Sequence, residues 1–394
     1  MSGEPGTPSP LETAEEELAQ LNAERVTRFL QRVRREVDEG LLPAAQVAVA
    51  RNGRLALFQS FGEARPDSLF CIFSATKAVT SAAAWLLIQE GRLDPGERVA
   101  GIIPEFASNG KDVVTVEQLF THTAGFPHAP FRPLDWRDRE TRLGRFAQWR
   151  LTWEPGTRYE YHPTATMWVI AEIIERRSGR TFQDFVRERV ALPLGLPELF
   201  VGLPEVENSR ALPCVHVGTA LTSEDYARLG LPEPPVTEVT EEAISNFNRP
   251  EIRAIGVPGG GGFTNAATLA LFYQGLLHGG LGDERVWTPE TLRSARRVRT
   301  GALRDPVHGK PASRGLGIVI AGDETRNYRG FGRTNSPEAF GHNGAGGQLA
   351  WVDPLSGISL AYLTNGHDRN VIREGRRGVA ISSHAASLLD PAEA

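Results

Sequence analysis

The sequence predicts an α+β protein: an antiparallel sheet built from both ends of the chain, flanked by N- and C-terminal helices, with a mostly helical lobe inserted. Three observations predict it. Strand-like runs gather near residues 45–73 and 315–364, helical periodicity dominates between them, and helical patterns begin and end the chain. The 394 residues, 40% of them hydrophobic, suffice for a large core in one domain or two lobes.

The first part of the chain predicts a helix followed by a hairpin. Residues 1–10 are rich in Pro, Gly and Ser, and we expect them to be disordered. Apolar residues recur at helical spacing over 11–39, which indicates an amphipathic helix. The β-prone runs 45–50 and 55–61 are separated by Asn52-Gly53, a strong hairpin signal.

A short strand, 69–73, leads directly into a helix over 74–90 that stops at Gly91. The apolar residues of this helix surround it instead of forming one stripe. A helix that is apolar on all sides belongs in the middle of a protein.

The remaining elements follow from the same patterns. They are helices at 166–178, 182–190, 223–229, 264–277 and 370–389, and strands at 315–321, 339–342, 347–352 and 359–364. Thr264 or Asn265 would cap the helix after the tetraglycine 259–262, which we interpret as a tight turn near the catalytic floor. We therefore expect a sheet domain, 11–92 with 255–394, and a helical lobe, 93–254.

Composition limits the classes of function. A net charge of −5 gives no basic excess to neutralise phosphates, so we expect no nucleic-acid partner. Cys71 and Cys214 are not in a Cys-x-x-Cys pair and are interpreted as buried free thiols. Neither a secretory signal nor a run of about 18 apolar residues is present, which predicts a cytoplasmic protein without a membrane partner. The oligomeric state cannot be derived.

The candidate nucleophile is Ser74, three residues before Lys77 at the start of the buried helix. Residues i and i+3 share one helix face, so the lysine amine can reach the serine hydroxyl. Burial disfavours the ammonium form and makes a neutral amine available as a base. Lysine is rare here, at Lys77, Lys111 and Lys310 only. A second Ser-x-x-Lys, Ser108 to Lys111, falls on an Asn-Gly turn where we expect nothing to bury the lysine.

Four segments in order resemble the class C β-lactamase-like superfamily of penicillin-recognising serine enzymes, which includes the family VIII carboxylesterases. They are Phe73-Ser74-Ala75-Thr76-Lys77, the Gln-Leu-Phe-Thr-His-Thr-Ala-Gly-Phe run at 118–126, Glu154-Pro155-Gly156-Thr157-Arg158-Tyr159-Glu160-Tyr161, and Gly341-His342-Asn343-Gly344-Ala345-Gly346-Gly347. The resemblance covers roughly residues 40–366 and implies the β-lactamase/penicillin-binding-protein fold.

The resemblance also implies roles for residues. Tyr161 would shuttle the serine proton with Lys77, and Tyr159 is its competitor in the sequence. The backbone N–H groups of Ser74 and Ala345 would form the oxyanion hole. The substrate-binding strand would contain His342, Asn343 and Gly344. Aromatic residues are candidate pocket walls, named only as a group: Phe126, Phe131, Trp136, Trp153 and Trp351.

Two departures from the family pattern favour an ester substrate. Pro163 stands where members often have Asn, so it offers no side-chain amide to a substrate amide. His342 replaces the lysine that helps to bind a substrate carboxylate. We therefore expect a carboxylesterase acting on small-molecule esters of small or medium acyl groups. The alternatives are an amidase, D-aminopeptidase or weak β-lactamase with the same machinery, and a non-catalytic binding protein on this fold.

Other chemistries lack their motifs. There is no Gly-x-Ser-x-Gly elbow, no metal-ligand spacing among the nine histidines, and no strand or acidic partner for a dinucleotide site at the tetraglycine. We expect no cofactor and no metal. His122, within Thr-His-Thr, is interpreted as a structural hydrogen-bonding residue.

Overall fold

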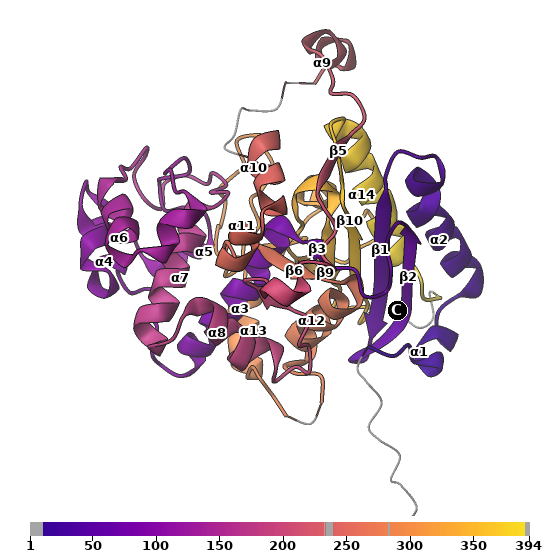
Figure 1. Cartoon of the computed structure of the whole chain (residues 1–394), viewed down its shortest axis with the longest axis horizontal. Coiled ribbons are helices and arrows are strands. Elements are labelled where there is room, and N and C mark those ends of the chain that lie inside the picture. Colours follow the sequence, from indigo (N-terminus) through magenta and orange to yellow (C-terminus); the bar gives the residue numbers. More distant parts are fainter. Residues whose placement is uncertain (1–10, 232, 234–238, 283, 391–394) are drawn as a thin grey trace, which may run out of the picture.

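The computed structural model describes residues 11–231, 233, 239–282 and 284–390. The predicted disordered segment 1–10 lies outside them. Figure 1 shows the helices between residues 99 and 186 on one side, with the sheet and the helices of both chain ends on the other. The domain boundaries at 92 and 254 stay predictions, since short strands of the inserted segment pair with strands outside it.

The main sheet has six strands, and every neighbouring pair is antiparallel. In spatial order they are β2 (Arg54–Gly62), β1 (Ala44–Arg51), β10 (Ser359–Thr364), β9 (Leu349–Val352), β8 (Phe340–Gly341) and β7 (Val319–Ile320). Strands from the two ends of the chain meet where β1 pairs with β10, Ala48 opposite Ala361. This confirms the predicted antiparallel sheet.

Turn chemistry fixes the edges of this sheet. Asn52 and Gly53, with φ of 51° and 76°, form the predicted hairpin turn between β1 and β2. The predicted strand 315–321 shortens to Val319–Ile320, because Gly315 and Gly317 turn the chain before it. The predicted run 339–342 likewise keeps two strand residues, Phe340–Gly341.

Helices cover both faces of the sheet. α2 (Ala23–Asp38) and α14 (Val371–Ala385) pack on one face, around Phe29, Tyr362 and Ile381. α12 (Ala266–His278), capped by Asn265, packs on the other. α3 (Thr76–Gln89) is buried over nearly its whole length, as its all-round apolar pattern predicts. The predicted helix 11–39 is two helices, α1 (Glu15–Ala19) and α2, because the Asn22 side chain caps a new start.

The inserted lobe is mostly helical, as expected. The helices between the two parts of the sheet are α4 (Val99–Ile102), α5 (Val116–Phe120), α6 (Arg139–Gln148), α7 (Ala165–Ser178), α8 (Phe182–Val186), α9 (Ser223–Leu229), α10 (Glu241–Ser245) and α11 (Pro250–Ile255). α13 (Pro289–Arg296) follows α12. Among the described residues, none of the helices has the length and apolar character to cross a membrane.

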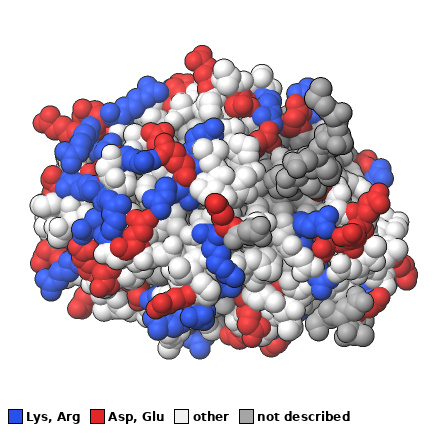
Figure 2. Space-filling view, turned by 90° about the horizontal axis from the view of Figure 1, so that it is seen from below, with Lys and Arg blue, Asp and Glu red and all other residues white. Residues whose placement is uncertain are grey.

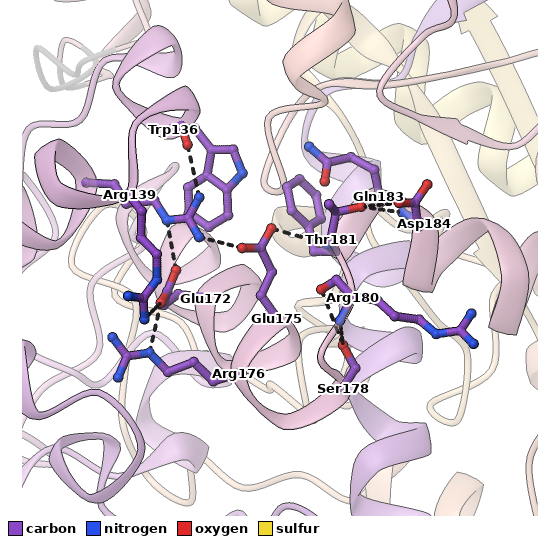
Figure 3. A network of polar contacts seen from close by, with 12 residues as sticks. Trp136, Arg139, Glu172, Glu175, Arg176, Ser178, Arg180, Thr181, Gln183 and Asp184 are labelled. Atoms are coloured by element: carbon purple, nitrogen blue, oxygen red, sulfur yellow. Dashed lines mark hydrogen bonds and ion pairs between the residues drawn. The ribbon is translucent and has the colours of Figure 1, made fainter.

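A buried ion network joins α6 to α7 (Figure 3). Glu172 of α7, with 1% of its side chain exposed, accepts from Arg142 of α6 at 2.9 Å and from Arg176 at 2.8 Å. Arg142 also donates to Glu175 and to the Trp136 carbonyl. Burial raises the pKa of Glu175, and Arg142 opposes that shift. Removing one member would leave a buried charge without its partner.

Two small sheets were not predicted. β3 (Phe70–Cys71) and β4 (Phe200–Val201) both pair with β6 (Gly262–Thr264), and β5 (Val215–Val217) pairs in parallel with β11 (Gly366–Asp368). β3 and β6 position the start of α3, since the Gly262 N–H donates to Thr76 Oγ1 at 2.8 Å.

Candidate active site

Ser74 lies on a tight turn between β3 and α3. The 3₁₀ turn Phe73–Ala75 precedes the helix, which begins at Thr76 and not at Ser74 as predicted. Phe73 has a φ of 43°, a left-handed conformation that costs a non-glycine residue energy. The Phe73 ring packs edge-on against the rings of Phe247 and His367, with ring centres 5.4 Å and 4.7 Å apart. These contacts hold Phe73 in this conformation.

The structure brings Ser74, Lys77 and Tyr161 together. Tyr161 Oη donates to Ser74 Oγ at 2.9 Å, and Lys77 Nζ donates to the same oxygen at 3.2 Å. Lys77 is fully buried, and its Nζ lies 5.0 Å from the centre of the Tyr161 ring. Two groups able to accept a proton thus contact one hydroxyl, which is the arrangement that activates a serine nucleophile.

Backbone carbonyls orient Lys77. Its Nζ donates to the Pro163 carbonyl at 2.6 Å and to the Gly259 carbonyl at 2.8 Å. Pro163 therefore orients the lysine through its backbone although it offers no side-chain amide. The tetraglycine lies at the site, as expected: the Gly259 carbonyl accepts from Lys77, and Gly259 and Gly260 line the same cavity as Ser74.

Tyr159 occupies a different position. Its hydroxyl accepts from Arg314 Nε at 3.0 Å and from Arg314 Nη2 at 2.7 Å. Burial raises the pKa of Tyr159 to about 12, with Arg314 opposing the shift. The contacts of Ser74 therefore favour Tyr161 over Tyr159 as the proton shuttle.

Sequence reasoning missed Arg314. Its guanidinium carbon lies 5.4 Å from the centre of the Tyr161 ring, and its Nη1 lies 3.3 Å from His342 Nε2. No motif contains Arg314, and arginine is the common basic residue of this chain, so no sequence signal distinguishes it. It brings a permanent positive charge to the site.

Three buried histidines surround the tyrosines. Burial holds the pKa values of His122 and His342 well below the ordinary range, and Arg314 adds to both shifts. Burial lowers the pKa of His162 to about 3. His162 Nδ1 donates to the Glu160 carbonyl at 2.7 Å, and its Nε2 accepts from the Phe126 N–H at 3.1 Å. His122 Nδ1 accepts from the His162 N–H, in keeping with the structural role expected for His122.

The third motif runs beside the nucleophile. A Cβ on Gly344 would lie 2.2 Å from the Ile72 carbonyl oxygen, so only glycine permits this close approach. The Asn343 side chain donates to the Gly330 carbonyl and accepts from the Ala350 N–H, contacts that stabilise the strand. The substrate-binding role of Asn343, like those of His342 and Gly344, stays a prediction. Ala345 and Ser74 line one cavity, and their oxyanion-hole role stays a prediction.

That cavity, which we call the acyl cavity, has a volume of about 310 Å³. Apolar side chains form most of its wall, among them Phe131, Trp168, Ile244, Phe247, Ile252 and Val257. Two residues predicted to form the pocket wall, Phe126 and Trp351, do not line this cavity. Phe126 is buried in the core behind His162. Trp351 is buried on the α14 face of the sheet, where its Nε1 donates to Ser382 Oγ.

The second Ser-x-x-Lys also corrects an expectation, because Lys111 is fully buried. Its Nζ donates to the carbonyls of Ser108 and Trp149, so the contact to Ser108 is with the backbone. Burial, with the charge of Arg150, lowers the pKa of Lys111 to about 8. The contacts of Lys111 are thus those of a structural residue in the helical lobe.

Cys71 and Cys214 are free and buried, as predicted. Within the described part of the chain, no group of three or more His, Cys, Asp or Glu side chains is arranged to hold a metal ion.

Comparisons with known proteins agree with this geometry. The family model described as Beta-lactamase matches residues 29–384. A "Putative D-alanyl-D-alanine carboxypeptidase" of Escherichia coli (strain K12) is 24% identical, over 89% of this chain and 84% of the relative.

Two solved structures are similar over nearly the whole chain. One is a penicillin-binding protein homologue from Caulobacter crescentus, with a TM-score of 0.75, 28% identity, and coverage of 94% of this chain and 99% of that one. The other is a family VIII carboxylesterase, with a TM-score of 0.75, 26% identity, and coverage of 93% and 98%.

Proposed function

This chain belongs to the Beta-lactamase family of serine hydrolases, and from that premise we propose that it is a carboxylesterase cleaving esters of small or medium acyl groups through an acyl-Ser74 intermediate. The observation that carries the proposal is the acyl cavity, which places apolar walls beside the Ser74 hydroxyl. An apolar acyl chain gains free energy on entering such a cavity, whereas a peptide would need polar partners there.

Each step of ester hydrolysis can be assigned to residues of this site. Ser74 Oγ attacks the ester carbonyl carbon while its proton passes to the Lys77–Tyr161 pair. The N–H groups of Ser74 and Ala345 stabilise the oxyanion. When the C–O bond of the ester breaks, Tyr161 returns the proton to the leaving alcohol. Water then repeats the sequence on the acyl-enzyme and releases the acid.

A second candidate is hydrolysis of D-alanyl peptides, or of a related amide or β-lactam. The name of the Escherichia coli relative supports it, and so does Arg314, whose positive charge near Tyr161 suits a substrate carboxylate. Pro163 counts against it, because no side-chain amide is available there to a peptide. The third alternative, a binding protein without activity, would not require Ser74, Lys77 and Tyr161 to contact one another.

Purified protein incubated with p-nitrophenyl butyrate and with a chromogenic cephalosporin separates these functions. We expect turnover of the ester at a far higher kcat/KM than the cephalosporin, and loss of that turnover in Ser74→Ala. Faster turnover of the cephalosporin would favour the second candidate. The absence of turnover of either compound, or of a D-alanyl-D-alanine peptide, would favour the binding protein.

A further inference from the structure

A second cavity adjoins the acyl cavity. It has a volume of about 580 Å³ and lies in the inserted lobe, between the segment that precedes α6 and the segment that follows it. The two cavities share Pro130, Phe131 and Arg132 in their walls. We propose that this second cavity is an anion subsite, which binds a carboxylate at the far end of the acyl chain. The preferred substrate is then a half-ester of a dicarboxylic acid, an inference that rests on the esterase function.

Basic side chains outnumber acidic ones in the wall of the second cavity. Its wall contains Arg132, Arg145, Arg150 and His128, against one carboxylate, Asp135. Asp135 pairs with Arg145 at 2.8 Å. His128 pairs with Glu160 at 3.1 Å.

Arg132 and Arg150 differ from most arginines of the chain. On the face shown in Figure 2, basic and acidic side chains are interspersed. Elsewhere in the chain, arginines such as Arg210 and Arg373 lie in ion pairs. Among the described carboxylates, none lies within 4.0 Å of a guanidinium nitrogen of Arg132 or Arg150. Both side chains are exposed, so a ligand can reach them.

The charge of this region is therefore positive. Among the residues that line the cavity, the charges of Asp135 and Arg145 offset each other, which leaves those of Arg132 and Arg150; Glu160, which pairs with His128, is not part of the wall. The charge of Arg150 already acts on its surroundings, since it contributes to the lowered pKa of the nearby Lys111. Arginine binds a carboxylate through two parallel N–H groups, so two arginines at one cavity wall suit an anionic ligand.

An aromatic wall connects the two cavities. Phe131 lines both cavities. The centre of its ring lies 4.5 Å from that of the Trp168 ring and 6.2 Å from that of the Trp149 ring. Trp168 belongs to the wall of the acyl cavity and Trp149 to that of the second cavity. Methylene groups extending from Ser74 can pack along these rings, with the terminal carboxylate beside Arg132 and Arg150.

Matched esters test the inference. We compare kcat/KM for the mono-p-nitrophenyl ester of octanedioic acid with that for p-nitrophenyl octanoate. We expect the charged ester to be preferred, less so as ionic strength rises. Arg132→Ala and Arg150→Ala should each lower the charged-to-neutral ratio about threefold to fivefold, as for an exposed ion pair. Arg293→Ala is the control, since Arg293 is also exposed but lies on α13 outside both cavities. An unchanged ratio in both cavity variants would overturn the inference.

A binding measurement separates this inference from the proposed function. Calorimetric titration with octanedioate needs no turnover. We expect the wild type and Arg293→Ala to bind it alike, and the Arg132→Ala/Arg150→Ala double variant to bind it about tenfold more weakly. Binding without turnover of either ester would remove the esterase function and retain the anion subsite. Turnover of neutral esters without any octanedioate binding would retain the esterase function and remove the anion subsite.

Discussion

The Nζ atom of Lys77 lies 2.6 Å from the carbonyl oxygen of Pro163. Because the contact uses a backbone oxygen, proline at position 163 orients the lysine without a side-chain amide. The backbone that follows Tyr161 orients the lysine, and the same short segment therefore positions both proton-accepting groups around Ser74.

Tyr161→Phe tests the proton shuttle. It removes the hydroxyl that contacts Ser74 Oγ, so we expect kcat for p-nitrophenyl butyrate to fall about 10²-fold to 10³-fold with little change in KM. Tyr159→Phe is the matched control, because the Tyr159 hydroxyl contacts Arg314. If Tyr159→Phe lowered kcat as much as Tyr161→Phe, the assignment of the shuttle would be wrong.

Arg314→Met tests the electrostatics of the site. A cation 5.4 Å from the Tyr161 ring favours the state in which the Ser74–Lys77–Tyr161 group has lost a proton. Without it, we expect the acidic limb of the pH profile of kcat/KM to move upward. Arg293→Ala should leave the profile in place. A uniform loss of rate at every pH would instead indicate that Arg314 only supports the fold.

Protonation of His162 should govern part of the acid stability. Burial lowers the pKa of His162 to about 3 in the folded chain, from an ordinary value of 6.5. Between these pH values the unfolded chain binds a proton that the folded chain does not, so stability is retained above about pH 6.5 and falls toward pH 3. His162 should account for about 2 kcal/mol of the loss between pH 7 and pH 5.

Urea unfolding at pH 7 and pH 5 measures this effect. His162→Gln should reduce the difference in unfolding free energy between the two pH values, whatever its stability at pH 7. His122 and His342, whose pKa values are lowered in the same direction, keep the remaining slope. An equal slope in the variant and the wild type would contradict the neutral, buried state of His162.

Glu172→Ala should destabilise the helical lobe. It leaves Arg142, 9% of whose side chain is exposed, without its most buried carboxylate. Breaking such a pair costs about 3–5 kcal/mol. Glu188→Ala, which removes an exposed partner of Arg180 in the same lobe, should cost less than about 1 kcal/mol. Chemical unfolding compares the two variants, and similar losses would refute the structural role of the network.

Local signals in the sequence predict much of this fold. Asn52-Gly53 encodes the hairpin, and the all-round apolar pattern encodes the buried α3. The strand predicted at 69–73 is present as β3, but β4, β5, β6 and β11 escape prediction because each is two or three residues long and pairs with a segment far away in the chain. The sequence contains no period that such short strands could show.

Some residues of the site can also be predicted from the sequence, and others cannot. Ser74 and Lys77 are predictable because helix geometry relates them, and Tyr161 because a family motif contains it. Arg314 is not predictable, because tertiary folding alone brings it to Tyr159 and His342. Trp351 shows the opposite failure: its residue type suits a pocket wall, but strand alternation places it on the other face of the sheet.

The proposed reaction requires Ser74 as its nucleophile. Labelling with a fluorophosphonate, followed by peptide mass spectrometry, tests it most directly. We predict one adduct, on Ser74, which is lost in Ser74→Ala and retained in Ser108→Ala, the variant of the second Ser-x-x-Lys. An adduct that persists in Ser74→Ala, or a wild-type protein that is not labelled, would contradict this role of Ser74.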